Sequence, residues 1–422
     1  MKIGSALKVV LLLVAPSITW AGILSPGLYR DGAGHSVYVG VENEAPDPAS
    51  NDYFDPSTQH TGDLPADSRL KPQKLIREDA AIIDAAGGPL GVSLYSMDAG
   101  KRTTVVLIHG NDPETREMGF LIPYFVLNGV NVISYDQRGT GKSSGNWQEN
   151  GPVQRAADVE AVYDAYSTNP HVDAAQMGVW GFSNGGWTAP IVATNLPLKF
   201  MILKSGPPES LETNVCYSVA QNMQHKNFDA QSVGSATEIW HSLIGALSGN
   251  VSWDTVRTLY LTASTKPWFS ASYLPYFYPP ELGFPPAPAA LAGLQRELLY
   301  DPAETLQKVR TPTLALFGAL DRNVDVANAP ALFRSAFAHG VMHDFTLQVY
   351  QDAGHQLKVS ATGFNGEPSQ PERLTAGYPQ IMIQWLSQRR LVRRREGNEL
   401  HHRATVSAVI KPASLSSRFT YA

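Results

Sequence analysis

The stretch GFSNG at residues 181–185 decides how this sequence is interpreted. It fits the pattern G-x-S-x-G, and its surroundings predict a short buried strand over residues 177–180 and a helix rich in small residues over 187–196. A serine between such a strand and such a helix lies on a sharp turn, with its hydroxyl exposed above a sheet. The two glycines leave room for strand and helix to pack closely, so larger residues at 181 or 185 should collide with their neighbours.

Strands and helices alternate along most of the chain, after a first hairpin. The hairpin has strands over residues 75–83 and 90–96, joined by a glycine-containing turn at 84–88. The strands expected after it cover residues 103–108, 131–135, 177–180, 200–203, 313–317 and 345–350, and the helices between them include 153–167. Near-continuous apolar strands that alternate with helices indicate a mostly parallel sheet with helices on both faces. Functional residues are then expected at the carboxyl ends of the strands.

A long insertion separates the strand at 200–203 from the strand at 313–317. It is rich in aromatic residues and proline, and it is much longer than one crossover helix requires. A connection of this length should have structure of its own. We expect a largely helical cap that folds over the strand ends, with its aromatic stripe forming the core of the cap or lining an apolar substrate site.

Two residues at predicted strand ends are candidate partners for Ser183. A serine hydroxyl needs a base within hydrogen-bond reach, and the base needs a carboxylate to orient it. His355 lies in a glycine-containing loop just past the strand at 345–350, and Asp321 lies just past the strand at 313–317. The pattern therefore predicts a catalytic triad of Ser183 as nucleophile, His355 as base and Asp321 as acid.

Three other aspartates compete with Asp321 for the acid role. Asp344 precedes its strand and so lies at the wrong edge of the sheet, whereas Asp352 is close to His355 and can simply shape its turn. Asp325 lies four residues beyond Asp321 in the same loop and stays open as an alternative acid.

The negative charge that develops on a tetrahedral intermediate needs hydrogen-bond donors, which in this arrangement are backbone N–H groups. One donor should be Asn184, the residue after the serine. The other should be Asn111, because Gly110 before it lets the backbone approach a substrate after the strand at 103–108. His109 is expected to be a turn residue.

Taken together, these motifs resemble those of the α/β-hydrolases. The matching pieces are His109-Gly110-Asn111, the DQRGTGKS loop at 136–143, residues 181–185, Gly318 with Asp321, and Gly354-His355. The resemblance covers roughly residues 75 to 390. It implies an α/β-hydrolase fold with a mostly parallel central sheet, helices on both faces and a helical cap insertion. It also implies that the 136–143 loop is largely structural, and Asp136 occupies the place where a phosphate-binding loop requires its first glycine.

Within that superfamily the resemblance favours an ester hydrolase. The serine nucleophile argues against dehalogenases, which use aspartate. The turn at residues 181–185 is also similar to the nucleophile turns of serine peptidases of the prolyl oligopeptidase and proline iminopeptidase type. Those peptidases commonly carry other residues after the serine, the latter type has a longer oxyanion loop, and a propeller cannot fit before residue 75. A serine exopeptidase or amidase, and a non-catalytic binding protein on a hydrolase scaffold, remain alternatives.

The sequence divides into a signal peptide at 1–21, an irregular N-terminal extension at 22–74, the first part of the core at 75–206, a cap insertion at 207–305, the second part of the core at 306–392 and a basic polar tail at 393–422. The extension includes one convincing strand at 36–41. Lys2 and Lys8 precede a short apolar run, and Ala21 suits signal cleavage. We expect a periplasmic or secreted protein without a stable membrane span, although an uncleaved signal anchor is an alternative.

Composition limits the other function classes. The chain has 422 residues, a net charge of -5 and no basic excess, so we expect no nucleic-acid partner. Cys216 is the single cysteine, which leaves no intramolecular disulfide, and no thiol-activating feature surrounds it. No metal and no cofactor are expected, and the expected substrate is a small ester or a short peptide.

Overall fold

The computed structural model describes residues 27–30, 36–39, 52–55, 60–63, 71–72, 75–85, 87–338, 340, 344–364 and 374–392. The predicted signal peptide at 1–21 and the predicted tail at 393–422 lie outside these residues. Among the described residues, no helix combines the length and the apolar character needed to cross a bilayer.

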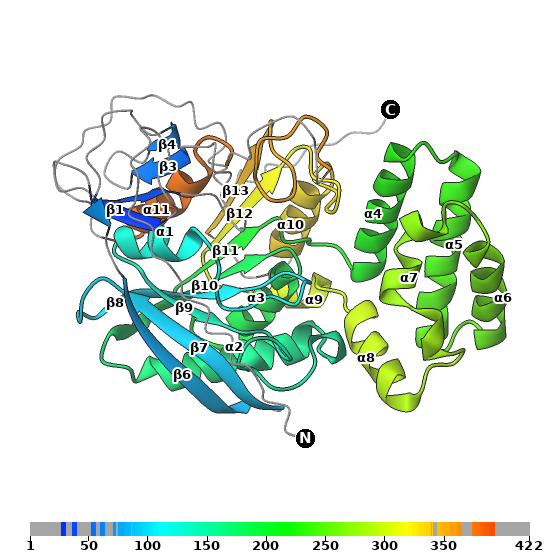
Figure 1. The fold of residues 1–422 in the computed structure, drawn as a ribbon, viewed down its shortest axis with the longest axis horizontal. Coiled ribbons are helices and arrows are strands. Elements are labelled where there is room, and N and C mark those ends of the chain that lie inside the picture. The colour runs from blue at the N-terminus through cyan, green and yellow to red at the C-terminus, as the bar shows by residue number, and fades with distance from the viewer. Residues whose placement is uncertain are drawn as a thin grey trace, which may run out of the picture.

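An eight-stranded sheet forms the centre of the molecule, in the order β13-β12-β11-β10-β8-β9-β7-β6 (Figure 1). Its strands are β6 (Ile76–Ala85), β7 (Gly88–Ser96), β8 (Arg102–Ile108), β9 (Asn131–Tyr135), β10 (Val172–Phe182), β11 (Phe200–Lys204), β12 (Thr313–Gly318) and β13 (Phe345–Tyr350). The pairs from β9 through β8, β10, β11 and β12 to β13 are parallel, whereas β6 pairs antiparallel with β7 and β7 pairs antiparallel with β9. The predicted mostly parallel sheet and its preceding hairpin are confirmed.

Helices cover both faces of this sheet. Successive residues of a strand point to opposite faces, and the residues on both faces are apolar. In β8, Val106 belongs to the cluster that includes α2 and α3, while Val105 and Leu107 belong to the cluster that includes α1 and α11. Figure 1 shows these helices on the two faces of the sheet. The covering helices are α1 (Leu121–Leu127), α2 (Pro152–Ser167), α3 (Gly185–Asn195), α9 (Ala303–Lys308), α10 (Ala329–Ala338) and α11 (Tyr378–Gln388). A sheet buried in this way on both faces explains why its strands are near-continuous apolar runs.

The strand order brings two distant loops together. β8 and β10 are neighbours in the sheet, although β9 lies between them in the sequence, so the winding direction of the chain reverses beside them. The loops that follow these two strands therefore meet at their carboxyl ends, the place where open α/β sheets bind their ligands. Residues 109–111 and Ser183 lie on these two loops.

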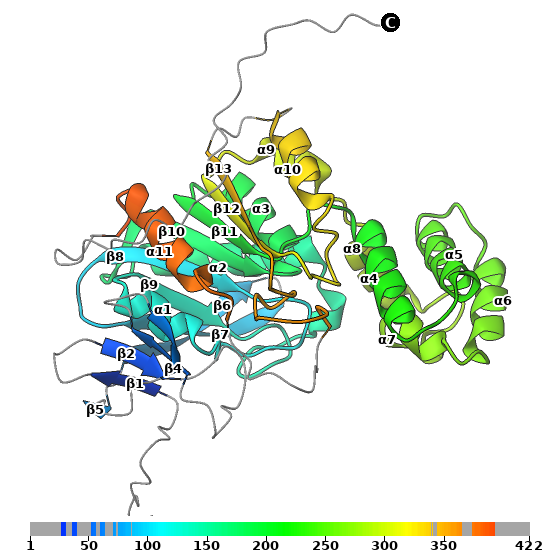
Figure 2. The same ribbon diagram turned by 90° about the horizontal axis from the view of Figure 1, so that it is seen from above.

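Five helices between β11 and β12 form the cap, which stands beside the strand ends as a separate helical group (Figures 1 and 2). They are α4 (Leu211–His225), α5 (Ala230–Leu247), α6 (Trp253–Ser264), α7 (Leu274–Phe277) and α8 (Pro288–Leu298). Trp240, Tyr260 and Tyr278 are at most 1% exposed inside the cap cluster, so much of the aromatic stripe is the cap's own core. The predicted end of the cap at residue 305 differs from the structure, since it cuts α9, whose Leu306 packs in the core cluster.

The N-terminal extension was predicted to be irregular, but its described residues are regular. Its described residues form a second, antiparallel sheet in the order β4-β3-β2-β1-β5, beside α1 (Figure 2). These strands are β1 (Gly27–Arg30), β2 (Ser36–Val39), β3 (Asp52–Asp55), β4 (His60–Asp63) and β5 (Lys71–Pro72). Strands of four residues or fewer are too short to show a clear alternation, so only β2 was visible in the sequence.

Candidate active site

Ser183 lies on a strained turn between β10 and α3. Its φ is +51°, in the left-handed region that side-chain-bearing residues rarely adopt. Its backbone N–H donates to the Lys204 carbonyl oxygen at 2.9 Å, which ties the turn to the end of β11. A Cβ atom on Gly181 would lie 2.5 Å from the Gly185 oxygen, and one on Gly185 would lie 2.7 Å from the His109 oxygen. Glycine at both positions is therefore required by the packing.

A chain of hydrogen bonds joins the three residues predicted as a triad. The Nε2 atom of His355 is 2.9 Å from the Ser183 Oγ atom, and its Nδ1 atom is 2.8 Å from the Asp321 Oδ2 atom. The other Asp321 oxygen accepts from the backbone N–H groups of Asn323 and Val324, at 2.8 and 2.9 Å. Asp321 is 2% exposed and His355 is 7% exposed. Three loops, after β10, β12 and β13, thus bring a hydroxyl, an imidazole and a carboxylate into line.

The competing aspartates bind other partners. Asp325 accepts a hydrogen bond from Asn328 at 2.7 Å, and Asp352 accepts one from Thr375 at 2.6 Å. Asp344 pairs with Arg389. Of the four candidate acids, Asp321 is the one hydrogen-bonded to His355.

The backbone around His355 is held by two close contacts. The Ser205 hydroxyl donates to the His355 carbonyl oxygen at 2.7 Å, and Ser205 itself has a positive φ of 49°. A Cβ atom on Gly318 would lie 2.2 Å from the Ala353 oxygen, so the loops after β12 and β13 approach each other at a glycine. The ring of Phe182 lies 5.1 Å from the imidazole of His355. The first two contacts fix the backbone of the loop, whereas Phe182 and the hydrogen bonds to Ser183 and Asp321 hold the ring.

The two predicted oxyanion residues, Asn111 and Asn184, lie close to Ser183. The Asn184 Nδ2 atom donates to the Asn111 Oδ1 atom at 3.2 Å. A Cβ atom on Gly110 would lie 3.6 Å from the Ser183 Cβ atom, so the loop after β8 passes directly beside the serine. Within the described part of the chain, the backbone N–H groups of Asn111 and Asn184 have no hydrogen-bond acceptor. Two unused backbone donors near a serine hydroxyl can bind an anionic oxygen.

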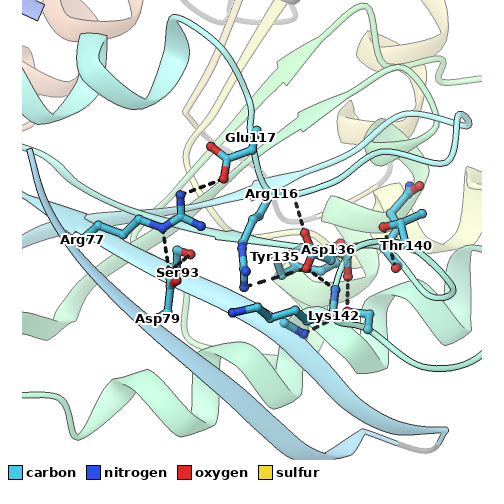
Figure 3. A network of polar contacts seen from close by, with 12 residues as sticks. Arg77, Asp79, Ser93, Arg116, Glu117, Tyr135, Asp136, Thr140 and Lys142 are labelled. Atoms are coloured by element: carbon cyan, nitrogen blue, oxygen red, sulfur yellow. Dashed lines mark hydrogen bonds and ion pairs between the residues drawn. The ribbon is translucent and has the colours of Figure 1, made fainter. Parts of the chain in front are cut away.

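The loop at 136–143 is a structural turn, as the resemblance implied. Asp136 accepts hydrogen bonds from the backbone N–H groups of Arg116 and Lys142, each at 2.8 Å (Figure 3). Ser143 donates to the Asp136 carbonyl oxygen and accepts from the Gly91 N–H. The Asp136 carboxylate thus ties its own loop, through the Lys142 amide, to the loop that carries Arg116.

His109 is also engaged in structure. Its Nδ1 atom is 3.1 Å from a Glu114 carboxylate oxygen, and its Nε2 atom is 2.6 Å from the Tyr135 carbonyl oxygen. With both ring nitrogens occupied and 1% of the residue exposed, His109 holds the turn after β8.

Three charged side chains near the site were not anticipated. Arg155 in α2 and Glu297 in α8 form an ion pair at 3.1 Å that also contacts Asn184. Glu209, between β11 and α4, is 6% exposed, and its Oε2 atom has no hydrogen-bond partner. None of the three follows a strand in a recognisable motif, so the sequence carried no signal for them.

Burial raises the pKa of Glu209 to about 7, and the nearby negative charges of Asp325 and Asp321 add to the shift, whereas a hydrogen bond from Asn214 opposes it. In the unfolded chain this carboxyl would lose its proton near its ordinary pKa of 4.5. Between these two values the native state holds a proton that the unfolded state has lost. The free energy of unfolding therefore falls as the pH rises through this window.

The variant Glu209→Gln should remove this pH dependence, because glutamine stays neutral. The free energy of unfolding of the variant, relative to the unmodified protein, should rise by about 3 kcal/mol between pH 4.5 and pH 8. Urea unfolding at several pH values measures this difference. Glu304→Gln, whose side chain is 90% exposed, is the matched control and should leave the slope unchanged. Equal slopes for Glu209→Gln and the unmodified protein would contradict the assignment.

Cys216 and possible metal ligands are the remaining reactive groups of the described residues. Cys216 in α4 is partly buried, and burial raises the pKa of its thiol to about 12, so the reactive thiolate is scarce at neutral pH. Among the described residues, no cluster of three or more His, Cys, Asp or Glu side chains is arranged to hold a metal ion.

Part of the chain matches a known family, and the chain is similar to several solved structures. Residues 118–211, which include the turn at Ser183, match the model of the prolyl oligopeptidase family. Similar solved structures include DcsB in complex with its substrate analogue, with 18% identity, 74% of this chain and 99% of that chain covered, and a TM-score of 0.47. An esterase from Pyrococcus furiosus shows 15% identity, coverage of 74% and 90%, and a TM-score of 0.47. Acetyl xylan esterase 1 from Thermoanaerobacterium sp. shows 14% identity, coverage of 76% and 86%, and a TM-score of 0.44.

The family match extends from α1 to the start of α4. The order and direction of the strands describe the rest of the core. The sheet begins with an antiparallel hairpin and continues with six parallel strands, and its winding reverses beside β8. Ser183 follows β10 on a turn with positive φ. With this topology and this strand-turn-helix, the chain has the α/β-hydrolase fold, and its residues 118–211 match the prolyl oligopeptidase family.

Proposed function

We propose that this protein is a serine hydrolase that cleaves carboxylic esters through an acyl-enzyme intermediate. The observation that carries the proposal is the continuous hydrogen-bond chain from Ser183 through His355 to Asp321. In this arrangement Nε2 of His355 faces the hydroxyl it would deprotonate, and the carboxylate at Nδ1 fixes the imidazole tautomer and stabilises the imidazolium.

In the first half of the reaction, the Ser183 Oγ atom attacks the ester carbonyl carbon and its proton passes to Nε2 of His355. The imidazolium then gives this proton to the departing alkoxide, so that an alcohol leaves and the acyl group stays on Ser183. In the second half, water attacks the acyl carbon and gives a proton to Nε2. The carboxylic acid leaves as Ser183 recovers that proton.

The charge on each tetrahedral intermediate is proposed to be stabilised by the backbone N–H groups of Asn111 and Asn184. Both groups lack an acceptor within the described residues, and the residues that carry them flank Ser183. Loss of one such donor typically lowers kcat by about 10² to 10³. No metal ion or cofactor takes part in the proposed steps.

The choice of an ester rather than a peptide bond is supported by two departures from the related peptidases. The oxyanion loop is the short His109-Gly110-Asn111, and the described strands before β6 form a small antiparallel sheet rather than a propeller. The match of residues 118–211 to the prolyl oligopeptidase family favours the second candidate, a serine exopeptidase or amidase on the same fold.

Paired assays with matched acyl groups separate these two candidates. We expect kcat/KM for a non-activated alkyl ester to exceed that for aminoacyl anilides by more than about tenfold, because the proposed substrate is an ester. Ser183→Ala is the control for background hydrolysis. Faster cleavage of anilides with a free α-amino group would overturn the ester assignment and favour the exopeptidase.

A further inference from the structure

A network of polar side chains joins the cap to both proposed oxyanion residues. Glu297, from cap helix α8, accepts from the Asn184 Nδ2 atom at 2.9 Å, and Asn184 Nδ2 also donates to Asn111 at 3.2 Å. Arg155, from α2, donates to the Asn184 Oδ1 atom at 2.5 Å and pairs with the Glu297 carboxylate at 3.1 Å. One carboxylate of the cap and one guanidinium of the core thus hold both ends of the Asn184 amide.

The chemistry of the partners fixes how the Asn184 amide points. Arg155 can only donate hydrogen bonds, and the ionised carboxylate of Glu297 can only accept them. The amide oxygen must therefore face Arg155, and the amide nitrogen must face Glu297 and Asn111. Asn184 is 4% exposed, directly follows Ser183 and directly precedes the first turn of α3. Locking its side chain therefore also restricts the backbone that carries its N–H group.

Stability alone is a weak reason for this ion pair. The side chains of Arg155 and Glu297 are 10% and 13% exposed, so both charges have lost most of their water. Replacing a buried ion pair by well-packed apolar residues is often neutral or stabilising, whereas removing one partner is costly. A pair of this kind is better explained by the geometry that it imposes on its neighbours.

The cap helix that supplies Glu297 contacts the core at close range. A Cβ atom on Gly151 would lie 2.3 Å from the Arg296 carbonyl oxygen, so the end of α8 rests on a glycine at the start of α2. Arg155 is one turn further along α2. The Arg296 side chain makes a separate cap-to-core contact, with hydrogen bonds to the Glu149 carbonyl oxygen at 3.0 and 3.2 Å.

We propose that Glu297 and Arg155 are positioning residues for the oxyanion hole, so that the contact of these two side chains with Asn184 completes the catalytic geometry. This inference rests on the proposed function, because it assigns Asn111 and Asn184 as the donors to the reacting oxygen. The cap then has a role in the rate of the chemical step, in addition to any role in substrate selection.

The test compares Glu297→Gln and Arg155→Lys with Arg296→Gln, the matched control on the same helix. The readouts are kcat and KM for an ester, and the second-order rate of labelling by a fluorophosphonate, in which Ser183 Oγ bonds to phosphorus and fluoride leaves. We expect Glu297→Gln and Arg155→Lys to lower kcat and the labelling rate by about tenfold to a hundredfold, with KM changed less than about threefold. Arg296→Gln should stay within about twofold of the unmodified protein.

A double variant, Arg155→Met with Glu297→Leu, guards against misfolding, since it leaves no unpaired buried charge. It should keep the thermal midpoint of the unmodified protein while losing kcat to the same extent. Wild-type labelling rates in the folded double variant, or an equal loss in Arg296→Gln, would overturn the inference. Absence of labelling at Ser183 in the unmodified protein would instead overturn the proposed function itself.

Discussion

Replacing Ser183 with alanine should lower kcat for ester hydrolysis by about 10⁴-fold or more, because the proposed acyl-enzyme forms on the hydroxyl that this change removes. The fold should persist, since His355 is the hydrogen-bond partner of Ser183 Oγ among the described residues, and alanine fits the same volume. The backbone bond from residue 183 to Lys204 does not depend on the side chain. Initial rates at saturating substrate, together with thermal unfolding of the variant, measure both parts of this expectation.

His355→Ala should produce a loss of the same order, and the double variant should be little worse than either single change, because the two groups act as one unit. Ser264→Ala, in the cap at the end of α6, is the control for a serine outside the site and should keep the full rate. Appreciable turnover by folded Ser183→Ala would show that another nucleophile carries the reaction.

The second large effect is expected at Asp321. Asp321→Asn should reduce kcat by about 10⁴-fold, because an amide nitrogen facing Nδ1 favours the imidazole tautomer that cannot accept the serine proton. The asparagine oxygen can still accept from the N–H groups of Asn323 and Val324, so the loop after β12 should keep its shape. Measuring kcat across the pH range separates this effect from a simple loss of folded protein.

Asp325→Asn is the matched control, since it makes the same chemical change four residues away in the same loop. The Asp325 carboxylate bonds Asn328 rather than His355, and its loss should change kcat less than about threefold. If Asp325→Asn were the more damaging of the two, the assignment of Asp321 as the acid would be wrong.

Local patterns were sufficient to predict most of the core. The strands β9 and β13 begin and end at the predicted residues, because most residues of each strand are apolar, aromatic or β-branched. β10 starts at Val172, five residues before the predicted Met177, because its first residues include Asp173 and Gln176, which break the apolar pattern. The N-terminal sheet was missed for a similar reason, since strands of four residues carry too little periodicity.

The candidate site also combines features that local patterns predicted with one that only the folded structure shows. Ser183, Asp321 and His355 were predictable because each follows a strand of a parallel sheet, and all such strands end at one edge. Asp321 was predicted as the acid and Asp325 was left open as the alternative, since both lie in the same loop. Only the folded loop shows that Asp321 faces His355. Roles for these residues, and export directed by residues 1–21, remain predictions to be tested.

By itself, then, the sequence determined the α/β architecture, the turn that carries Ser183 and the strand ends from which its partners come, because periodicity and turn chemistry are local properties. Only the tertiary structure decided which aspartate meets His355, that the cap aromatics pack largely against one another, and that Glu297 reaches Asn184. Glu297 and Arg155 are 142 residues apart in the chain. Their contact depends on how the cap packs against the core, and no local pattern carries that information.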